Sequence, residues 1–397
     1  MNAKHGAKYY DNKRLPMKLL FFVTEDWYFC SHRLPISRAA RDAGCEVVVA
    51  THVDTCRDAI KREGFRLIPL QMRRRSKNPL RELAAVLEII NIYRRERPDL
   101  VHHVALKPVL YGALAARFVG VPAFVNALAG LGYVFSSSQS RAKILKQFVR
   151  MAFRVLLNRQ NSVVLLQNPD DLRMLIESKT ILPEHTALIR GSGVDVQRFR
   201  PSPEPGDEPV MVTLVARMLR DKGILEFVEA SRLLKQQGIQ FRAVLVGMPD
   251  PDNPTSISAS QLNAWQDAGL VEWWGKSDDI PDVWAQSHIA VLPSAYGEGV
   301  PMSLIEAAAC GRPIITTDMP GCREIVQHEK NGLLVPVKDS KALAGAICRL
   351  IENPDLRRQM GQEGRKLVEA EFAESVVVTQ TLNLYQSMLG ERWPTTD

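Results

Sequence analysis

Short apolar segments alternate with longer amphipathic ones along nearly the whole chain. In the first half, the short segments are rich in β-branched and other apolar residues, as buried strands are. These predicted strands are Lys18–Val23, Glu46–Ala50, Arg66–Leu70, Leu100–His103, Ala123–Asn126, Val163–Gln167 and Ala187–Ile189. Helical periodicity separates them, for example over Leu34–Ala43, Leu80–Arg95, Val109–Val119 and Asp170–Glu177. This alternation predicts a parallel sheet covered by helices on both faces.

The pattern stops at residues 196–209, where four prolines and Gly206 predict a linker. It then restarts, with strands expected at Val210–Ala216, Arg242–Val246, Val271–Trp273, Ile289–Leu292, Ile314–Thr316 and Gly332–Val335. Helices are expected between and after them, at Gly223–Gln236, Met302–Ala309, Lys341–Glu352 and Leu356–Ala370.

We therefore predict an α/β fold of two Rossmann-like, doubly wound domains, residues 17–195 and 210–370, that face a cleft. Residues 371–397 are expected to form a C-terminal helix that returns to the first domain. Ligands of such sheets bind at the carboxyl ends of the strands, so the cleft is where we expect the chemistry.

The composition agrees with a globular chain of two or three domains, since 46% of its 397 residues are apolar and 24% are charged. Apolar runs are far shorter than the ~20 residues that a membrane-spanning helix needs. The polar, basic segment 1–16 has no apolar stretch of the kind a secretory signal needs, and we expect it to be a disordered leader of a cytoplasmic protein. The six cysteines show no metal-finger spacing and indicate reduced thiols.

The charge is divided unequally between the two halves. The first 200 residues hold 33 Lys and Arg against 17 Asp and Glu, while the rest hold 18 against 27. No acidic residue lies between Asp99 and Asp170. A basic field attracts anions such as phosphorylated substrates or acidic lipids. No nucleic-acid-binding module is visible, so we expect no nucleic-acid partner.

A basic amphipathic helix is predicted at residues 141–159. Lys146, Arg150 and Arg154 repeat every four residues and therefore share one helical face, while apolar residues cover much of the rest. Such a helix suits the surface of an anionic membrane. The pattern leaves open the alternative of a core helix with a solvated basic stripe.

The first strand does not lead into a dinucleotide-binding loop. It ends in Thr24-Glu25-Asp26-Trp27, where a nicotinamide or flavin enzyme has G-x-G-x-x-G. Carboxylates at that turn would repel a pyrophosphate, and we expect no cofactor.

A better phosphate site is predicted in the second half. Residues 295–301, AYGEGVP, follow a predicted strand and lead into the helix Met302–Ala309. Glycines allow close approach of the backbone, and the free N–H groups of a helix start bind phosphate. Glu298 and Glu306 flank this start, and carboxylates accept hydrogen bonds from sugar hydroxyls.

Positive charge is expected from the end of the first strand of the second domain. Arg217 and Lys222 lie on either side of a turn that ends at Gly223, and together they suit a diphosphate. A surface turn with ordinary charges is the alternative for this segment by itself. Taken with the glutamates, it predicts a pocket for a nucleotide-diphosphate sugar.

These motifs resemble those of the family-4 glycosyltransferases, retaining enzymes of the GT-B fold. The resemblance rests on Arg217 with Lys222-Gly223, on Glu298-Gly299-x-Pro301 with Glu306, and on two further signatures, Gly191-x-Gly193-Val194-Asp195 and residues 331–335. It implies that Glu298 contacts hydroxyls of the donor sugar and Glu306 those of the ribose, while Arg217 and Lys222 neutralise the leaving diphosphate. Further donor contacts are implied for Gly297, Gly299, Val300, Gly247 and Lys276.

The resemblance implies no bound metal. Asp250-Pro251-Asp252 has the form of a metal-binding D-x-D, but it lies among Pro249, Pro251 and Pro254, and we interpret it as a turn.

The first half is similar to a bacterial subgroup that extends sugars on undecaprenyl diphosphate or builds surface polysaccharide. We expect the acceptor to contact His32, His103, Lys107 and Gly130. An anionic lipid acceptor would explain the basic first domain, and we expect peripheral attachment to the inner face of the cytoplasmic membrane. Two alternatives stay open at this point, namely a nucleotide-sugar epimerase and a two-domain protein that only binds a small ligand.

Overall fold

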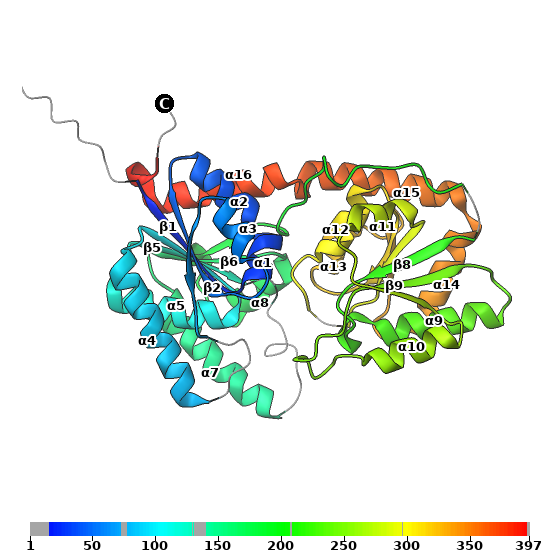
Figure 1. Ribbon diagram of the computed structural model, residues 1–397, viewed down its shortest axis with the longest axis horizontal. Helices are drawn as coiled ribbons and strands as arrows, with labels where there is room; N and C mark the ends of the chain where they lie inside the picture. The colour runs from blue at the N-terminus through cyan, green and yellow to red at the C-terminus, as the bar shows by residue number, and fades with distance from the viewer. Residues whose placement is uncertain are drawn as a thin grey trace, which may run out of the picture.

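The computed structural model describes residues 16–72, 78–128, 130, 140–206, 209–295 and 297–394, with only the backbone over 140–145. Two α/β domains follow one another along the chain and lie side by side in Figure 1. The predicted leader and most of the segment 129–139 fall outside the described residues. The fold class predicted from the alternation of strands and helices is confirmed.

The first domain is built on a seven-stranded parallel sheet in the order β3-β2-β1-β4-β5-β6-β7. The chain builds one side of the sheet from β1 and then returns to start the other side at β4, which makes these neighbours the topological switch point. The strands are β1 (Lys18–Glu25), β2 (Glu46–His52), β3 (Arg66–Pro69), β4 (Leu100–Val104), β5 (Ala123–Leu128), β6 (Ser162–Leu166) and β7 (Thr186–Leu188). The helices are α1 (Asp26–His32), α2 (Leu34–Asp42), α3 (Arg57–Arg62), α4 (Pro79–Glu96), α5 (Leu106–Val119), α7 (Ser140–Leu157) and α8 (Pro169–Glu177).

Alternate side chains of β1 enter the two cores of this domain. Leu20 and Phe22 pack with α4, α5 and α7, whereas Leu19, Phe21 and Val23 pack with α1, α2 and the C-terminal helix. All five side chains are buried. This is the period-two pattern of a strand covered on both faces, and it explains why the segment is continuously apolar.

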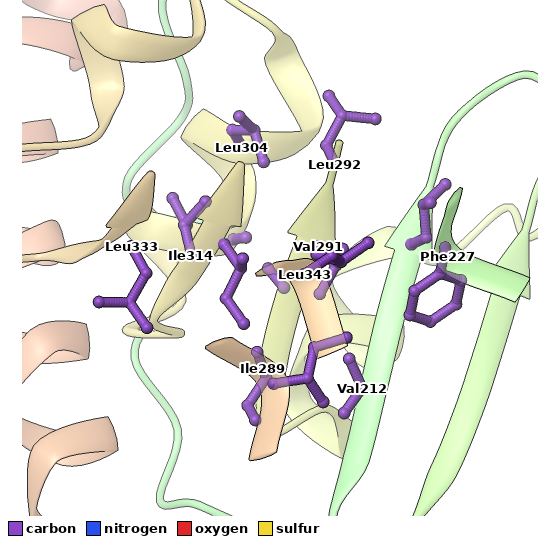
Figure 2. Packing of buried hydrophobic residues seen from close by; sticks show 14 of the residues in the cluster. Val212, Phe227, Ile289, Val291, Leu292, Leu304, Ile314, Leu333 and Leu343 are labelled. Atoms are coloured by element: carbon purple, nitrogen blue, oxygen red, sulfur yellow. The ribbon is translucent and has the colours of Figure 1, made fainter. Parts of the chain in front are cut away.

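The second domain has a six-stranded parallel sheet in the order β10-β9-β8-β11-β12-β13, so that its switch point lies between β8 and β11. The strands are β8 (Met211–Val215), β9 (Arg242–Val246), β10 (Glu272–Gly275), β11 (Ile289–Leu292), β12 (Ile314–Thr317) and β13 (Gly332–Val335). The helices are α9 (Ile224–Gln236), α10 (Ala259–Asp267), α11 (Ile280–Gln286), α12 (Met302–Ala309), α13 (Cys322–Ile325), α14 (Ser340–Glu352) and α15 (Pro354–Leu367). Figure 2 shows Val212, Ile289, Val291 and Ile314 from the central strands packed with Leu304 of α12 and Leu343 of α14.

The chain crosses between the domains twice, and the two crossings are hydrogen-bonded to each other. Val194 N donates to Phe372 O at 3.0 Å, and Glu374 N donates to Val194 O at 2.9 Å. A π-helical turn, Val368–Phe372, then leads into α16 (Glu374–Leu389), which packs against α2 of the first domain. Tyr385 of α16 is buried there, with its hydroxyl 2.5 Å from His102 Nδ1.

The turn expected at Thr24–Trp27, after the first strand, differs from that prediction. β1 continues to Glu25, and α1 occupies residues 26–32. The buried Asp26 carboxylate accepts hydrogen bonds from Asp54 N and Cys56 N, both at 2.8 Å. Asp26 therefore anchors the segment after β2, a contact between residues 28 to 30 positions apart that local patterns do not indicate.

Candidate active site

Three neighbouring strands of the second sheet lead into the candidate site. β8 is followed by the turn that carries Arg217 and Lys222, β9 by Gly247, and β11 by the loop 294–301, which we call the donor loop. Because parallel strands end at the same edge, these segments gather beside the switch point between β8 and β11. Arg217, Lys222 and Glu298 therefore all follow the carboxyl ends of adjacent strands.

Lys222 and Glu298 form an ion pair between the lysine ammonium and Oε2 of the carboxylate. Their side chains are only 18% and 13% exposed. The second carboxylate oxygen, Oε1, accepts a hydrogen bond from Ser294 Oγ at 2.7 Å. The structure thus brings together two of the residues that the sequence singled out, which are 76 positions apart along the chain.

Gly223 allows the lysine-bearing turn to approach β11. Its φ is +77°, and a Cβ at this position would lie 2.1 Å from Pro293 O. Ala295 N also donates to Asp221 O at 3.0 Å, so the turn and the donor loop are joined through the backbone. A side chain at position 223 would separate Lys222 from Glu298.

The donor loop is held from both domains. Val300 N donates to Gln167 Oε1 at 3.4 Å, and Asn168 Nδ2 donates to Glu298 O at 3.3 Å. On the side of the second domain, a Cβ on Gly321 would overlap Gly299 O. α12 starts directly after this loop, and its first amide groups carry the positive end of the helix dipole.

A cavity of about 470 Å³ opens between the domains at the ends of β8 and β9. Its walls include Arg217, Gly247 and Lys276 from the second domain and Glu25, Trp27 and Asp54 from the first. Gly247 has a φ of +138°, and a Cβ there would lie 1.9 Å from Ala216 O. The volume is within the range of about 300–1,000 Å³ of small-molecule sites.

Both cations of the cavity wall are paired with carboxylates. Arg217 Nη1 lies 2.6 Å from Asp250 Oδ2, and Lys276 Nζ lies 2.7 Å from Asp278 Oδ1. Asp252 also lines the cavity, and residues 251–252 form a turn. No group of three or more His, Cys, Asp or Glu side chains within the described residues is arranged to hold a metal ion.

Glu306 lies on α12 and is partly buried, and no hydrogen bond or ion pair joins it to Lys222 or Glu298 in the part of the chain that the structure describes. Burial raises the pKa of its carboxyl to about 7, while the Arg198 guanidinium and the Trp284 indole act in the opposite direction. At neutral pH the side chain is therefore close to half protonated and able both to donate and to accept a hydrogen bond.

Two of the predicted acceptor residues are partly exposed and lie beyond the ends of β1 and β4. His32 ends α1 and stacks on Tyr28 with ring centroids 4.1 Å apart, and burial followed by the charge of Arg33 lowers its pKa to about 3. Lys107, in the first turn of α5, lies 3.0 Å from Glu82 Oε2.

Gly130, another of the four predicted acceptor residues, meets the donor loop instead of an open surface. Its φ is +87°, and a Cβ would lie 2.7 Å from Gly299 N. The main chain of the first domain is thus in close contact with that of the second at the site itself.

The prediction that His103 contacts the acceptor is corrected by its surroundings. The side chain is fully buried, with Nε2 3.0 Å from Tyr93 Oη and Nδ1 2.8 Å from Asn126 Oδ1. Burial lowers its pKa to about 4. Both ring nitrogens are engaged inside the core, so His103 supports the fold of the first domain and does not reach a substrate.

Two arginines of the basic stripe predicted on helix 141–159 form hydrogen bonds within the protein. Arg150 Nη2 and Arg154 Nη2 donate to Ser178 O at 3.0 and 2.8 Å, and Arg154 Nε donates to Lys179 O at 2.8 Å. These arginines satisfy carbonyls at the C-terminal end of α8. The sequence pattern left open a helix on a membrane surface and a helix that packs into the core. The contacts of the two arginines agree with the core helix.

Sequence reasoning missed Gln167 and Asn168, which tie the first domain to the donor loop. They directly follow β6, and Asn168 caps α8 by accepting from Asp171 N at 2.8 Å. The carboxyl-edge rule applied to β6 would have placed both residues on the cleft.

Two doubly wound domains, with a lysine and a glutamate paired at the switch point of the second, define a glycosyltransferase of the GT-B type. Residues 195–367 match the family model of glycosyl transferases group 1, and residues 18–167 match that of the glycosyl transferase 4-like domain. The chain belongs to these glycosyltransferase families. It is an enzyme, and neither the epimerase nor the binding-protein alternative receives support.

Named relatives cover most of the chain. One, from Campylobacter jejuni, is an N,N'-diacetylbacillosaminyl-diphospho-undecaprenol α-1,3-N-acetylgalactosaminyltransferase, 26% identical over 90% of this chain and 95% of its own length. Another, from Escherichia coli, is a UDP-Gal:α-D-GlcNAc-diphosphoundecaprenol α-1,3-galactosyltransferase, 24% identical over 69% of this chain and 72% of its own length.

Solved structures share the fold. Alr3699/HepE of Anabaena in complex with UDP superimposes with a TM-score of 0.75 at 20% identity, covering 94% of this chain and all of its own. A glycosyltransferase from Rickettsia africae gives a TM-score of 0.75 at 19% identity, over 94% of this chain and 99% of its own.

Proposed function

We propose that the protein is a retaining glycosyltransferase that moves a hexose or N-acetylhexosamine from a nucleotide-diphosphate sugar, a UDP-sugar, to a glycan acceptor linked to a lipid diphosphate. The reaction would serve the assembly of bacterial surface polysaccharide or a related glycan. The observation that carries the proposal is the shielded Lys222–Glu298 pair beside the switch point. The named relatives, which act on undecaprenyl-diphosphate-linked sugars, support the acceptor class.

The chemistry follows from the charges at the carboxyl edge. When the bond between the anomeric carbon and the diphosphate breaks, negative charge gathers on the leaving oxygen, and fixed cations stabilise it most when they are shielded from water. Lys222, Arg217 and the start of α12 supply that positive charge. The acceptor oxygen then bonds to the anomeric carbon from the same face, and its proton passes to the departing diphosphate.

Glu298 would hold the sugar during transfer. Its carboxylate already accepts from Ser294 and from Lys222, and its remaining lone pairs suit the hydroxyls of a hexose. The cavity bounded by Gly247 and Lys276 suits the nucleoside, with Trp27 of the first domain on the facing wall. For Glu306 we keep the implied contact with the ribose hydroxyls.

The acceptor would enter on the side of the first domain. Lys107, whose ammonium is 3.0 Å from Glu82, lies in the first turn of α5 and suits the diphosphate of a lipid-linked sugar. His32 ends α1 at the same carboxyl edge, and we propose it as a contact of the acceptor sugar.

Peripheral binding to an anionic membrane is part of the proposal. No helix in the described residues is long and apolar enough to cross a bilayer. The helices α4 and α7 both pack against α5 (Figure 1). Each nevertheless exposes apolar side chains. We call these side chains the α4–α7 face; they are Leu80, Leu83 and Leu87 on α4 and Phe148, Met151 and Val155 on α7. Their spacing places them on one side of each helix, and α7 lies in the stretch between Asp99 and Asp170 that has no acidic residue.

The experiment is a transfer assay with UDP-, GDP- and ADP-hexoses and N-acetylhexosamines on a short-chain polyprenyl-diphosphate N-acetylhexosamine. We expect wild-type protein to add one sugar with retention of the anomeric configuration, read by mass spectrometry and NMR. Lys222→Met and Glu298→Gln should each lose about 10²–10³-fold in kcat, the usual effect of removing a group that stabilises the transition state.

Glu229→Gln is the matched control, because it removes an ion pair with Arg232 on α9 away from the cleft. Activity of both site variants within threefold of the wild type would remove the site assignment. An isomerised sugar formed without acceptor would instead indicate an epimerase.

A further inference from the structure

We propose that Asp250 is a positioning residue that orients Arg217 towards the diphosphate of the donor. The inference rests on the proposed function and deepens it, because it gives a role to the Asp250-Pro251-Asp252 motif. From the sequence by itself, that motif indicates only a turn.

Arg217 contacts Asp250 through only one nitrogen of its guanidinium. Arg217 Nη1 is 2.6 Å from Asp250 Oδ2, and this is the one hydrogen bond of that guanidinium within the described residues. A guanidinium carries five N–H donors in a planar fork. A single contact at Nη1 restricts the orientation of the group and leaves Nη2 and Nε for phosphate oxygens.

Asp250 is itself held in place. Its backbone N–H donates to Ser256 Oγ at 2.9 Å, and its carbonyl accepts from Asn253 N at 2.7 Å. The carboxylate side chain is only 16% exposed, against 40% for Arg217. Pro249, Pro251 and Pro254 restrict the backbone of the same loop. The carboxylate is therefore the fixed partner and the arginine the adjustable one.

The loop after β9 is also joined to the segment that bears Arg217. Met218 N donates to Met248 O at 3.0 Å, Ile257 N to Met218 O at 2.8 Å, and Arg220 N to Thr255 O at 2.8 Å. Thr255 Oγ1 adds a bond of 3.0 Å to Asp221 Oδ2. These bonds lie on both sides of the ion pair, so Asp250 and Arg217 belong to one connected unit on the wall of the cavity.

The carboxylate has two opposed effects on a bound diphosphate. It holds Arg217 in the orientation needed when charge develops on the leaving group, which favours catalysis. It also repels the diphosphate and so weakens the binding of the nucleotide. Loss of the charge alone should therefore separate affinity from turnover, whereas damage to the loop would impair both.

The experiment compares Asp250→Asn in the full-length protein, with and without Arg217→Ala, using UDP binding by calorimetry and donor turnover. We expect Asp250→Asn to bind UDP at least threefold more tightly and to lower kcat at least tenfold, with unchanged thermal unfolding. In the Arg217→Ala background the same substitution should still tighten UDP binding, because the repulsion does not involve the arginine, but it should leave kcat unchanged, because positioning requires the arginine. Glu229→Gln, which breaks the ion pair with Arg232 on α9, serves as the control and should behave as the wild type.

Equal effects of Asp250→Asn on kcat in both backgrounds would overturn the proposal, as would weaker UDP binding together with lower kcat. Donor turnover measured without an acceptor separates this result from the proposed function. If the wild type turns over the donor but transfers no sugar, the proposed function fails, while the effect of Asp250→Asn on that turnover still decides the role of Asp250. A wild type that neither binds UDP nor turns over the donor would overturn both.

Discussion

The backbone of Gly130 lies directly against that of Glu298, so that a Cβ on the glycine would stand 2.8 Å from the carbonyl carbon of the glutamate. One residue belongs to the first domain and the other to the donor loop of the second. Asn168 adds a hydrogen bond to Glu298 O across the same boundary. The donor loop is therefore in contact with both domains, and its position depends on how closely they approach.

Gly130→Ala should force the domains apart at the donor loop. The added methyl would lie 2.7 Å from Gly299 N, and the φ of +87° costs a non-glycine residue about 1 kcal/mol. We expect kcat/KM to fall at least tenfold and the radius of gyration with UDP, measured by small-angle scattering, to increase.

Gly120→Ala separates the effect of backbone strain from the effect of the contact between the domains. Gly120 has a φ of +77°, and a Cβ added to it would meet no atom within 4 Å, so it carries the same backbone cost without the contact between domains. Its activity should stay within twofold of the wild type. Equal losses in the two variants would show that backbone strain alone accounts for the effect.

Much of the fold, and the residues that the structure gathers at the candidate site, could be predicted because the signals in the sequence are local. Buried strands have short apolar segments, and Gly223 and Gly299 mark turns next to them. The relation between Gly130 and Glu298 could not be predicted in this way, since it depends on how two domains meet. The same holds for Asp26, whose buried carboxylate serves loop amides that lie 28 and 30 residues further along the chain.

The buried His103 predicts a loss of stability on acidification. Its pKa is about 4 in the folded protein, against an ordinary 6.5, so the unfolded chain binds the proton more readily. The stability that depends on the neutral ring is complete above pH 6.5 and is lost as the pH falls towards 4. His32 and His102, whose pKa values are also lowered by burial, act in the same direction.

Urea unfolding at pH 7.5, 6 and 5 should show this decline, and His103→Gln should reduce its slope. The shift corresponds to about 3 kcal/mol for a group so fully buried. At pH 7.5 the variant should be less stable by about 1–3 kcal/mol, a loss typical of an impaired buried hydrogen-bond pair, while kcat changes less than threefold. A collapse of kcat in a folded His103→Gln protein would restore the contact with the acceptor that its burial argues against.

The pKa of Glu306 predicts the opposite pH dependence of stability, namely a stability that falls as the pH rises. Burial raises its pKa to about 7 from an ordinary 4.5, so the folded protein binds the proton more readily than the unfolded chain. Its contribution to stability is present below pH 4.5 and is lost as the pH rises towards 7. Glu306→Gln should therefore gain stability relative to the wild type at pH 8, measured by thermal unfolding, but not at pH 4.

The same substitution tests the implied contact with the ribose. Glu306→Gln keeps the size of the side chain but removes the ionised form, so donor KM should rise about tenfold at pH 8 and less at pH 6. A KM that is equal to that of the wild type at both pH values would place Glu306 in the fold alone.

The surface proposed to bind a membrane consists of side chains whose exposure the sequence did not indicate. The sequence indicated a basic stripe on the helix 141–159, but Arg150 and Arg154 bond to the end of α8. The apolar side chains left exposed, Phe148 among them, form one side of α7, and Leu83 belongs to the corresponding side of α4. A sequence read one helix at a time does not show that both helices pack on α5.

Charges placed on the α4–α7 face should release the protein from membranes. In co-sedimentation with vesicles of 30% phosphatidylglycerol at low salt, we expect wild-type protein to bind and to be partly released at 0.5 M salt. Leu83→Asp and Phe148→Asp should each weaken binding at least tenfold, because burying such a side chain contributes about 1.5–3 kcal/mol.

Leu188→Asp, at an exposed leucine of β7 outside this face, is the control and should bind as the wild type does. Equal losses in all three variants would point to a general effect of added negative charge, and no binding of the wild type would exclude this face as a membrane site.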